Sequence, residues 1–89
     1  MNPDSEIYLF GSRARGDYSK YSDWDLLVLL NSDDVSFTLE TSLYDRLFDV
    51  ELKTGEVISP IIYSKKEWNN KYNITPLYES IAKEGVRIK

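Results

Sequence analysis

A glycine–serine pair beside two arginines is the first group of residues in this chain that could do chemistry. Gly11 and Ser12 follow a short apolar run, and Ser12 is a candidate cap for a short helix over 13–16. Backbone N–H groups at such a strand-to-helix junction lack partners and favour anions such as phosphate. Arg13 and Arg15 add two positive charges at this turn. The segment is therefore a candidate phosphate-binding turn.

Two aspartates, Asp23 and Asp25, form the second group. They lie at the start of the segment 24–30, which contains the longest apolar run of the chain. Residues i and i+2 of a strand project from the same face, and neighbouring carboxylates repel each other unless a cation lies between them. The chain has no His and no Cys, so a metal would need oxygen ligands, which favour Mg²⁺, Mn²⁺ or Ca²⁺. A phosphate turn beside such a pair indicates nucleotidyl or phosphoryl transfer.

The elements that must position these residues are predicted in the order β-α-β-α-β-α-α-β. This order describes a small α/β (α+β) fold, a mixed β-sheet with helices packed against it. The expected strands lie at 7–10, 24–30, 57–63 and 86–88, and the expected helices at 13–16, 36–53, 64–71 and 76–85. The continuous apolar run at 26–30 is typical of a central strand that is covered on both faces.

The long segment 36–53 admits two interpretations. Apolar residues recur in it at the spacing of one helical face, at Leu39, Leu43, Leu47 and Val50. Between 48 and 52, however, apolar residues alternate with charged ones, as in a strand. The length of the segment and the stop at Gly55, where a C-cap glycine would lie, favour the helix.

Capping patterns and one proline define the later elements. Ser64 and Glu67 form an S-x-x-E capping box, and Thr75 precedes Pro76 in the pattern of a helix start. Pro60 cannot donate a hydrogen bond to a neighbouring strand, so the strand at 57–63 is expected to lie at a sheet edge or to be irregular at Pro60.

Length and composition exclude several classes of function. The 89 residues are expected to form one domain over 1–89. A net charge of −4 argues against general nucleic-acid binding, which needs a basic surface. The absence of Cys and His excludes disulfides, Cys nucleophiles, Ser-His-Asp triads and Cys/His zinc sites. No apolar run is long enough to span a membrane and no signal peptide is recognisable, which predicts a cytoplasmic protein.

The stretch GSRARG, followed by SDWDLLV, resembles the nucleotidyltransferase superfamily related to DNA polymerase β, and within it the minimal nucleotidyltransferases. The family pattern is a strand that ends in Gly-Ser, a loop, and Asp-x-Asp at the head of the next strand. The strong part of the match covers 7–30. The roles that the resemblance implies are nucleotide binding by Gly11, Ser12, Arg13 and Arg15, and catalysis with Mg²⁺ binding (or Mn²⁺) by Asp23 and Asp25.

The resemblance also implies a reaction and a partner. Family members transfer a nucleoside monophosphate from a nucleoside triphosphate, here expected to be ATP, to a hydroxyl group. In the minimal subfamily the partner is often a separate helical protein, and the two form a toxin–antitoxin pair in which the transferase modifies the toxin. The alternative is a degenerate domain that binds a nucleotide or a partner without chemistry.

Two departures from the family pattern stand out. The family usually has a third carboxylate on the next core strand, but 57–63 contains no Asp or Glu, and Ser59 stands about where the acid is expected. Asp49, Glu51 and Glu56 remain as candidates for it, the first two if 48–52 is a strand. The family also usually begins with a helix, whereas six residues precede Ile7. We therefore expect an apolar sheet surface open to a partner or to self-association.

Overall fold

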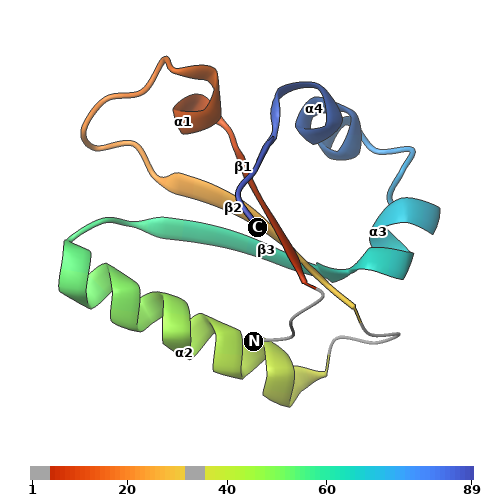
Figure 1. The fold of residues 1–89 in the computed structure, drawn as a ribbon, viewed down its shortest axis with the longest axis horizontal. Coiled ribbons are helices and arrows are strands. Elements are labelled where there is room, and N and C mark those ends of the chain that lie inside the picture. Colours follow the sequence, from red (N-terminus) through yellow and green to blue (C-terminus); the bar gives the residue numbers. More distant parts are fainter. Residues whose placement is uncertain (1–4, 32–35) are drawn as a thin grey trace.

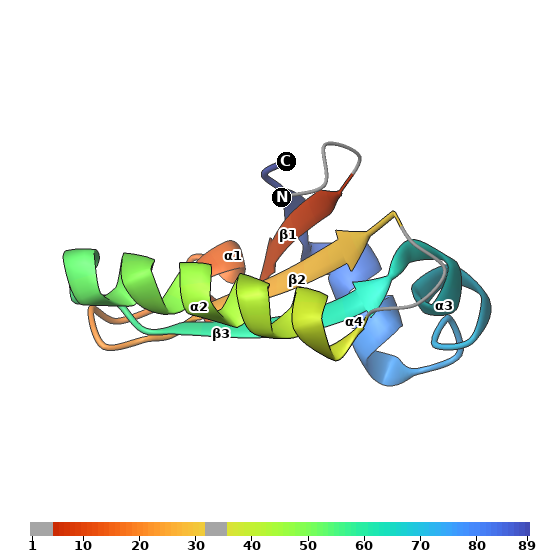
Figure 2. The same cartoon turned by 90° about the horizontal axis from the view of Figure 1, so that it is seen from below.

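The computed structural model describes residues 5–31 and 36–89 of the chain. These residues form a four-stranded mixed sheet in the order β3-β2-β1-β4, with helices packed against it (Figures 1 and 2). The strands are β1 (Glu6–Phe10), β2 (Trp24–Leu30), β3 (Ile58–Ser64) and β4 (Val86–Arg87), and the helices are α1 (Ser12–Arg15), α2 (Phe37–Thr54), α3 (Lys65–Asn70) and α4 (Pro76–Glu84). The predicted fold class and order of elements are confirmed.

The apolar run of β2 explains its place inside the sheet. β2 pairs antiparallel with β1 and parallel with β3, and its side chains alternate between two buried clusters. The buried members are Leu27, Leu29, Trp68 and Ile81 on the side of α3 and α4, and Val28, Leu30 and Leu43 on the side of α2. Both faces of the strand are thus covered, as the unbroken apolar run predicts.

Helix α2 settles the ambiguity of the long segment. Its N-cap is Ser36, whose side chain accepts a hydrogen bond from the N–H of Leu39 at 3.1 Å. Its C-cap is Gly55, in the left-handed conformation with φ 74°. The strand interpretation of 48–52 is wrong, because these residues lie within one continuous helix that is capped at both ends. The alternation that suggested a strand places Phe48 and Leu52 in solvent, 57% and 69% exposed.

The other local signals were mostly correct. Ser64 and Thr75 are N-caps whose side chains accept from the N–H groups of Glu67 and Tyr78, contacts that contribute about 1 kcal/mol each. β3 lies at a sheet edge, as Pro60 predicts. The expected cap at Ser12 is wrong: α1 begins at Ser12 itself, and the N-cap is Gly11, without a side-chain hydrogen bond.

The topology brings three chain segments to one end of the sheet. Phe10, the last residue of β1, pairs with Asp25, and Asp25 pairs on its other side with Ser59 of β3. The turn after β1 and the starts of β2 and β3 therefore meet, with α1 beside them (Figure 1).

An apolar groove remains open on the α2 side of the sheet. It has a volume of about 300 Å³ and is lined mainly by Trp24, Leu26, Val50, Ile58 and Ile88. None of the described helices is both long and apolar enough to cross a membrane.

Candidate active site

The turn after β1 places the backbone of Gly11 directly against a carboxylate of β2. Gly11 has φ 77° and ψ −159°, a region that is essentially reserved for glycine. A Cβ added there would overlap the side chain of Asp25. The next two N–H groups, of Ser12 and Arg13, open α1 and so have no partner within the helix. Because α1 has four residues, these N–H groups, rather than a helix dipole, would attract an anion.

Asp25 of β2 interacts with Asp23, which lies one residue before the strand. Asp25 is partly buried, and its pKa is raised above the ordinary value, first by loss of solvation and then by the negative charge of Asp23. The positive charge of Arg15 acts in the opposite direction. A cation bound by the pair would remove the repulsion that raises this pKa. The carboxylate oxygens therefore fit a hard divalent cation such as Mg²⁺.

Ser59 completes this end of the sheet. It pairs in register with Asp25, and its hydroxyl donates a hydrogen bond to Oδ2 of Asp23 at 3.1 Å. Ser59 thus lies next to both aspartates, at the place where the sequence led us to expect a third carboxylate. Its hydroxyl offers an oxygen atom but no charge. Over residues 5–31 and 36–89, no three acidic side chains gather in a way that could hold a metal ion.

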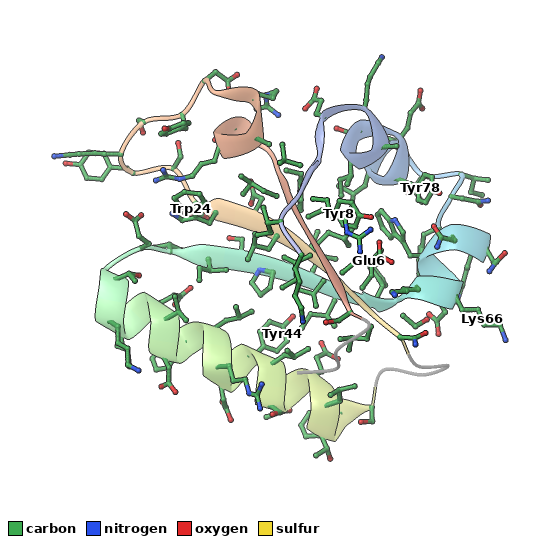
Figure 3. The ribbon with its side chains drawn as sticks, in the orientation of Figure 1. Glu6, Tyr8, Trp24, Tyr44, Lys66 and Tyr78 are labelled. Carbon is green, nitrogen blue, oxygen red and sulfur yellow. The ribbon has the colours of Figure 1, made fainter. Side chains whose placement is uncertain are left out.

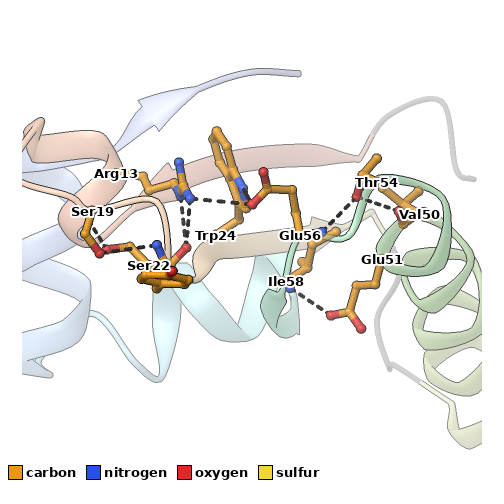
Figure 4. A network of polar contacts seen from close by, with 10 residues as sticks. Arg13, Ser19, Ser22, Trp24, Val50, Glu51, Thr54, Glu56 and Ile58 are labelled. Atoms are coloured by element: carbon orange, nitrogen blue, oxygen red, sulfur yellow. Dashed lines mark hydrogen bonds and ion pairs between the residues drawn. The ribbon is translucent and has the colours of Figure 1, made fainter.

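The three candidates for a third carboxylate lie in other surroundings. Asp49 is exposed on α2, and Oε1 of Glu51 accepts the N–H of Ile58 at 2.7 Å. Oε2 of Glu56 accepts the indole N–H of Trp24 at 3.2 Å and lies 3.5 Å from Nη2 of Arg13 (Figure 4). Glu51 therefore holds the start of β3 in place, and Glu56 holds Trp24 and Arg13.

The two arginines of the turn differ sharply in their surroundings. Arg15 is exposed and forms ion pairs with Asp17 at 3.3 Å and with Glu84 of α4 at 3.4 Å. Exposed pairs of this kind contribute little, so Arg15 can exchange them for a phosphate. The side chain of Arg13 is 7% exposed, and its contacts all lie within the protein. Sequence reasoning missed the link between Arg13, Glu56 and Trp24, and no motif signalled it.

A second cavity, of about 320 Å³, lies against α3 and α4 at the other end of β1. Glu6, Tyr8 and Tyr78 are among its lining residues (Figure 3). The Tyr8 hydroxyl donates to Glu6 at 2.6 Å, and this hydrogen bond is the main cause that lowers the pKa of Glu6. Glu6 also pairs with Lys65 at 3.2 Å. Its carboxylate is therefore well stabilised without a ligand.

Comparisons with known proteins show the family of the chain. A family model described as a nucleotidyltransferase domain matches residues 1–88. A Methanocaldococcus jannaschii protein named "Putative protein adenylyltransferase MJ0604" is 39% identical over 80 residues, which are 90% of this chain and 73% of that protein. A structure described as a toxin–antitoxin with AMP-PNP has a TM-score of 0.63 at 20% identity, over 94% of this chain. This chain spans 59% of that solved chain, so the likeness shows the fold.

Proposed function

Because the chain belongs to the nucleotidyltransferase domain family of transferases, we propose that it transfers a nucleoside monophosphate from a nucleoside triphosphate to a hydroxyl group, with Mg²⁺ as cofactor. The observation that carries this proposal is the close approach of the Gly11 backbone to the Asp25 carboxylate. It supports a site in which the proposed phosphate-binding turn lies next to the carboxylate pair. ATP is the proposed nucleotide, because the relative is named an adenylyltransferase and the structural neighbour is described as a complex with AMP-PNP.

The residues of this chain would divide the work between phosphate and cation. The N–H groups after Gly11 and the hydroxyl of Ser12 would hold the phosphates, with Arg15 free to reach them. Asp23 and Asp25 would hold Mg²⁺, which supplies positive charge against the triphosphate and the departing pyrophosphate. In the transfer, a bond would form between the acceptor oxygen and the α-phosphorus, the bond from that phosphorus to pyrophosphate would break, and the proton of the acceptor hydroxyl would pass to water.

The acceptor is proposed to lie on a partner protein. The relative is named a protein adenylyltransferase, and the structural neighbour is described as a toxin–antitoxin. The site itself is open, since Asp23 and the loop from Arg15 to Tyr21 are exposed. A partner can therefore approach it directly. We propose that this partner is a helical toxin and that the chain acts as its antitoxin by modifying it.

One observation favours a second function, that of a nucleotide- or partner-binding domain without chemistry. The position beside Asp25 on β3 holds Ser59, and a hydroxyl replaces the charge of a third acid. With two carboxylates the domain can still bind a nucleotide and a cation. Transfer would then be slow or absent, because no third carboxylate stands at the position of Ser59 to accept the proton of the acceptor hydroxyl.

Calorimetric titration with ATP, GTP, CTP and UTP, with and without Mg²⁺, tests the proposal. We expect Mg²⁺-dependent binding of ATP by the parent protein, loss of binding in Asp25→Asn, and normal binding in Asp45→Asn. Asp45 is an exposed residue of α2, so this control loses the same charge outside the site. Equal binding by all three proteins would refute the site. ATP labelled at the α-phosphate then separates the two functions, since transfer of label to a protein requires an active enzyme.

A further inference from the structure

The guanidinium of Arg13 is enclosed by the loop that leads from α1 to β2 (Figure 4). Its Nε and Nη2 both donate to the carbonyl oxygen of Ser22, at 3.1 and 3.0 Å. Its central carbon lies 4.1 Å from the centre of the Trp24 ring and 4.8 Å from that of Tyr18. Two hydrogen bonds and two aromatic faces thus surround one positive charge.

A carboxylate completes this group of contacts. Oε2 of Glu56 lies 3.5 Å from Nη2 of Arg13 and accepts the indole N–H of Trp24 at 3.2 Å. Ser22 and Trp24 are the two chain neighbours of Asp23. The guanidinium therefore holds the backbone before Asp23 and, together with Glu56, the side chain after it.

These contacts make Arg13 a poor candidate for binding phosphate. To reach a phosphate, it would have to leave the Ser22 carbonyl, an ion pair and two aromatic rings. An arginine that is nearly buried loses much if its partners are removed, because its charge would then be desolvated without compensation. Arg15, in contrast, would leave only exposed ion pairs.

We propose that Arg13 is a positioning residue. Through its contacts with Ser22, Trp24 and Glu56, it holds Asp23 and Asp25 in the geometry that binds the cation. The inference rests on the proposed function only in that the aspartate pair binds a cation. It makes Glu56 a partner of Arg13 rather than the third carboxylate of the cation site. It also leaves Arg15 as the arginine of the turn that is available to a phosphate.

The direction in which cation affinity changes when Arg13 is replaced tests this proposal. Removing the positive charge of Arg13 should, by Coulomb's law alone, leave the cation binding of the two carboxylates unchanged or strengthen it. Loss of positioning should weaken it, and changes to groups that orient metal ligands typically reduce metal affinity by about tenfold or more. If Arg13 only contacted phosphate, its replacement would likewise leave cation binding unchanged or stronger when no nucleotide is present.

The experiment measures Mn²⁺ binding by electron paramagnetic resonance without nucleotide. The variants are Arg13→Met, which keeps the aliphatic stem, and Arg13→Lys, which keeps the charge but loses the planar fork. Arg46→Met, at an exposed position of α2, is the control. We expect both Arg13 variants to bind Mn²⁺ about tenfold more weakly than the parent, and Arg46→Met to match the parent. Equal or tighter binding by Arg13→Met would overturn the proposal.

Amide exchange gives a second readout that is independent of metal and nucleotide. The N–H of Ser22 donates to Ser19 and that of Trp24 donates to Val57, at 3.1 and 2.9 Å. We expect both amides to exchange faster in Arg13→Met than in the parent and in Arg46→Met, while amides of β2 beyond Leu27 keep their rates. Unchanged exchange at Ser22 and Trp24 would refute positioning. If the parent binds no Mn²⁺, the proposed function fails, but the exchange rates still decide the role of Arg13.

Discussion

Replacing Gly11 with alanine tests the contact on which the site depends. Alanine at φ 77° and ψ −159° costs about 1–3 kcal/mol in backbone strain. Its Cβ would also overlap the Asp25 carboxylate, and such overpacking typically costs about 1–3 kcal/mol more. Rotation of the Asp25 carboxylate about its Cβ–Cγ bond gives only partial relief, since Cβ and Cγ would stay 3.3 and 3.1 Å from the new methyl group. We therefore expect a loss of about 2–6 kcal/mol in the free energy of unfolding.

Gly16→Ala is the matched control for this substitution. Gly16 has φ 85° in the left-handed region, but no atom lies within 4 Å of an added Cβ. Gly16→Ala should lower the free energy of unfolding by about 1–2 kcal/mol, from backbone strain alone. Urea unfolding measures both losses, and calorimetry measures Mg²⁺–ATP binding, which we expect Gly11→Ala to lose and Gly16→Ala to keep. Equal destabilisation by the two variants, with binding intact in both, would refute the proximity of Gly11 and Asp25.

Two further predictions concern the acidic pair. Asp25→Asn should be more stable than the parent at neutral pH without metal, since burial and Asp23 hold the pKa of Asp25 above 3.8 and so penalise its charged form. This penalty is complete above the raised pKa of the folded protein and fades as the pH falls toward the pKa of Asp25 in the unfolded chain. Urea unfolding should therefore show that the stability advantage of Asp25→Asn over the parent shrinks on acidification. An advantage that grows on acidification would contradict the raised pKa of Asp25. Ser59→Asp should bind Mn²⁺ more tightly than the parent or the neutral Ser59→Asn and should melt at a lower temperature without metal. An Mn²⁺ affinity equal to that of Ser59→Asn would show that Ser59 does not face the cation.

The fold could be predicted from the sequence because its elements carry local signals. The apolar run at 26–30 identifies the central strand, and Ser64, Thr75 and Gly55 mark helix ends by contacts within one or two turns. The ambiguity at 48–52 arose because a helix with partly exposed apolar residues can imitate a strand over a short window. The caps of α2, at Ser36 and Gly55, decide it.

The proximity of Asp23 and Asp25 could be predicted for the same reason, since the two are separated by one residue at the start of β2. The group around Arg13 could not be predicted, because its contacts depend on how distant segments meet. Trp24 and Glu56 are 32 positions apart in the sequence, and no local pattern relates them. The pairing of Asp25 with Ser59 likewise depends on the register between β2 and β3, which only the structure shows.

In the proposed function, the Gly11 turn and the Asp23–Asp25 pair form one nucleotide site. Amide chemical shifts of the ¹⁵N-labelled protein, recorded as Mg²⁺–ATP is added, test it most directly. We predict that the largest shift changes fall on Ser12, Arg13 and 23–25. Changes centred instead on Glu6 and Tyr8, at the cavity against α3 and α4, or no changes at all, would contradict the claim.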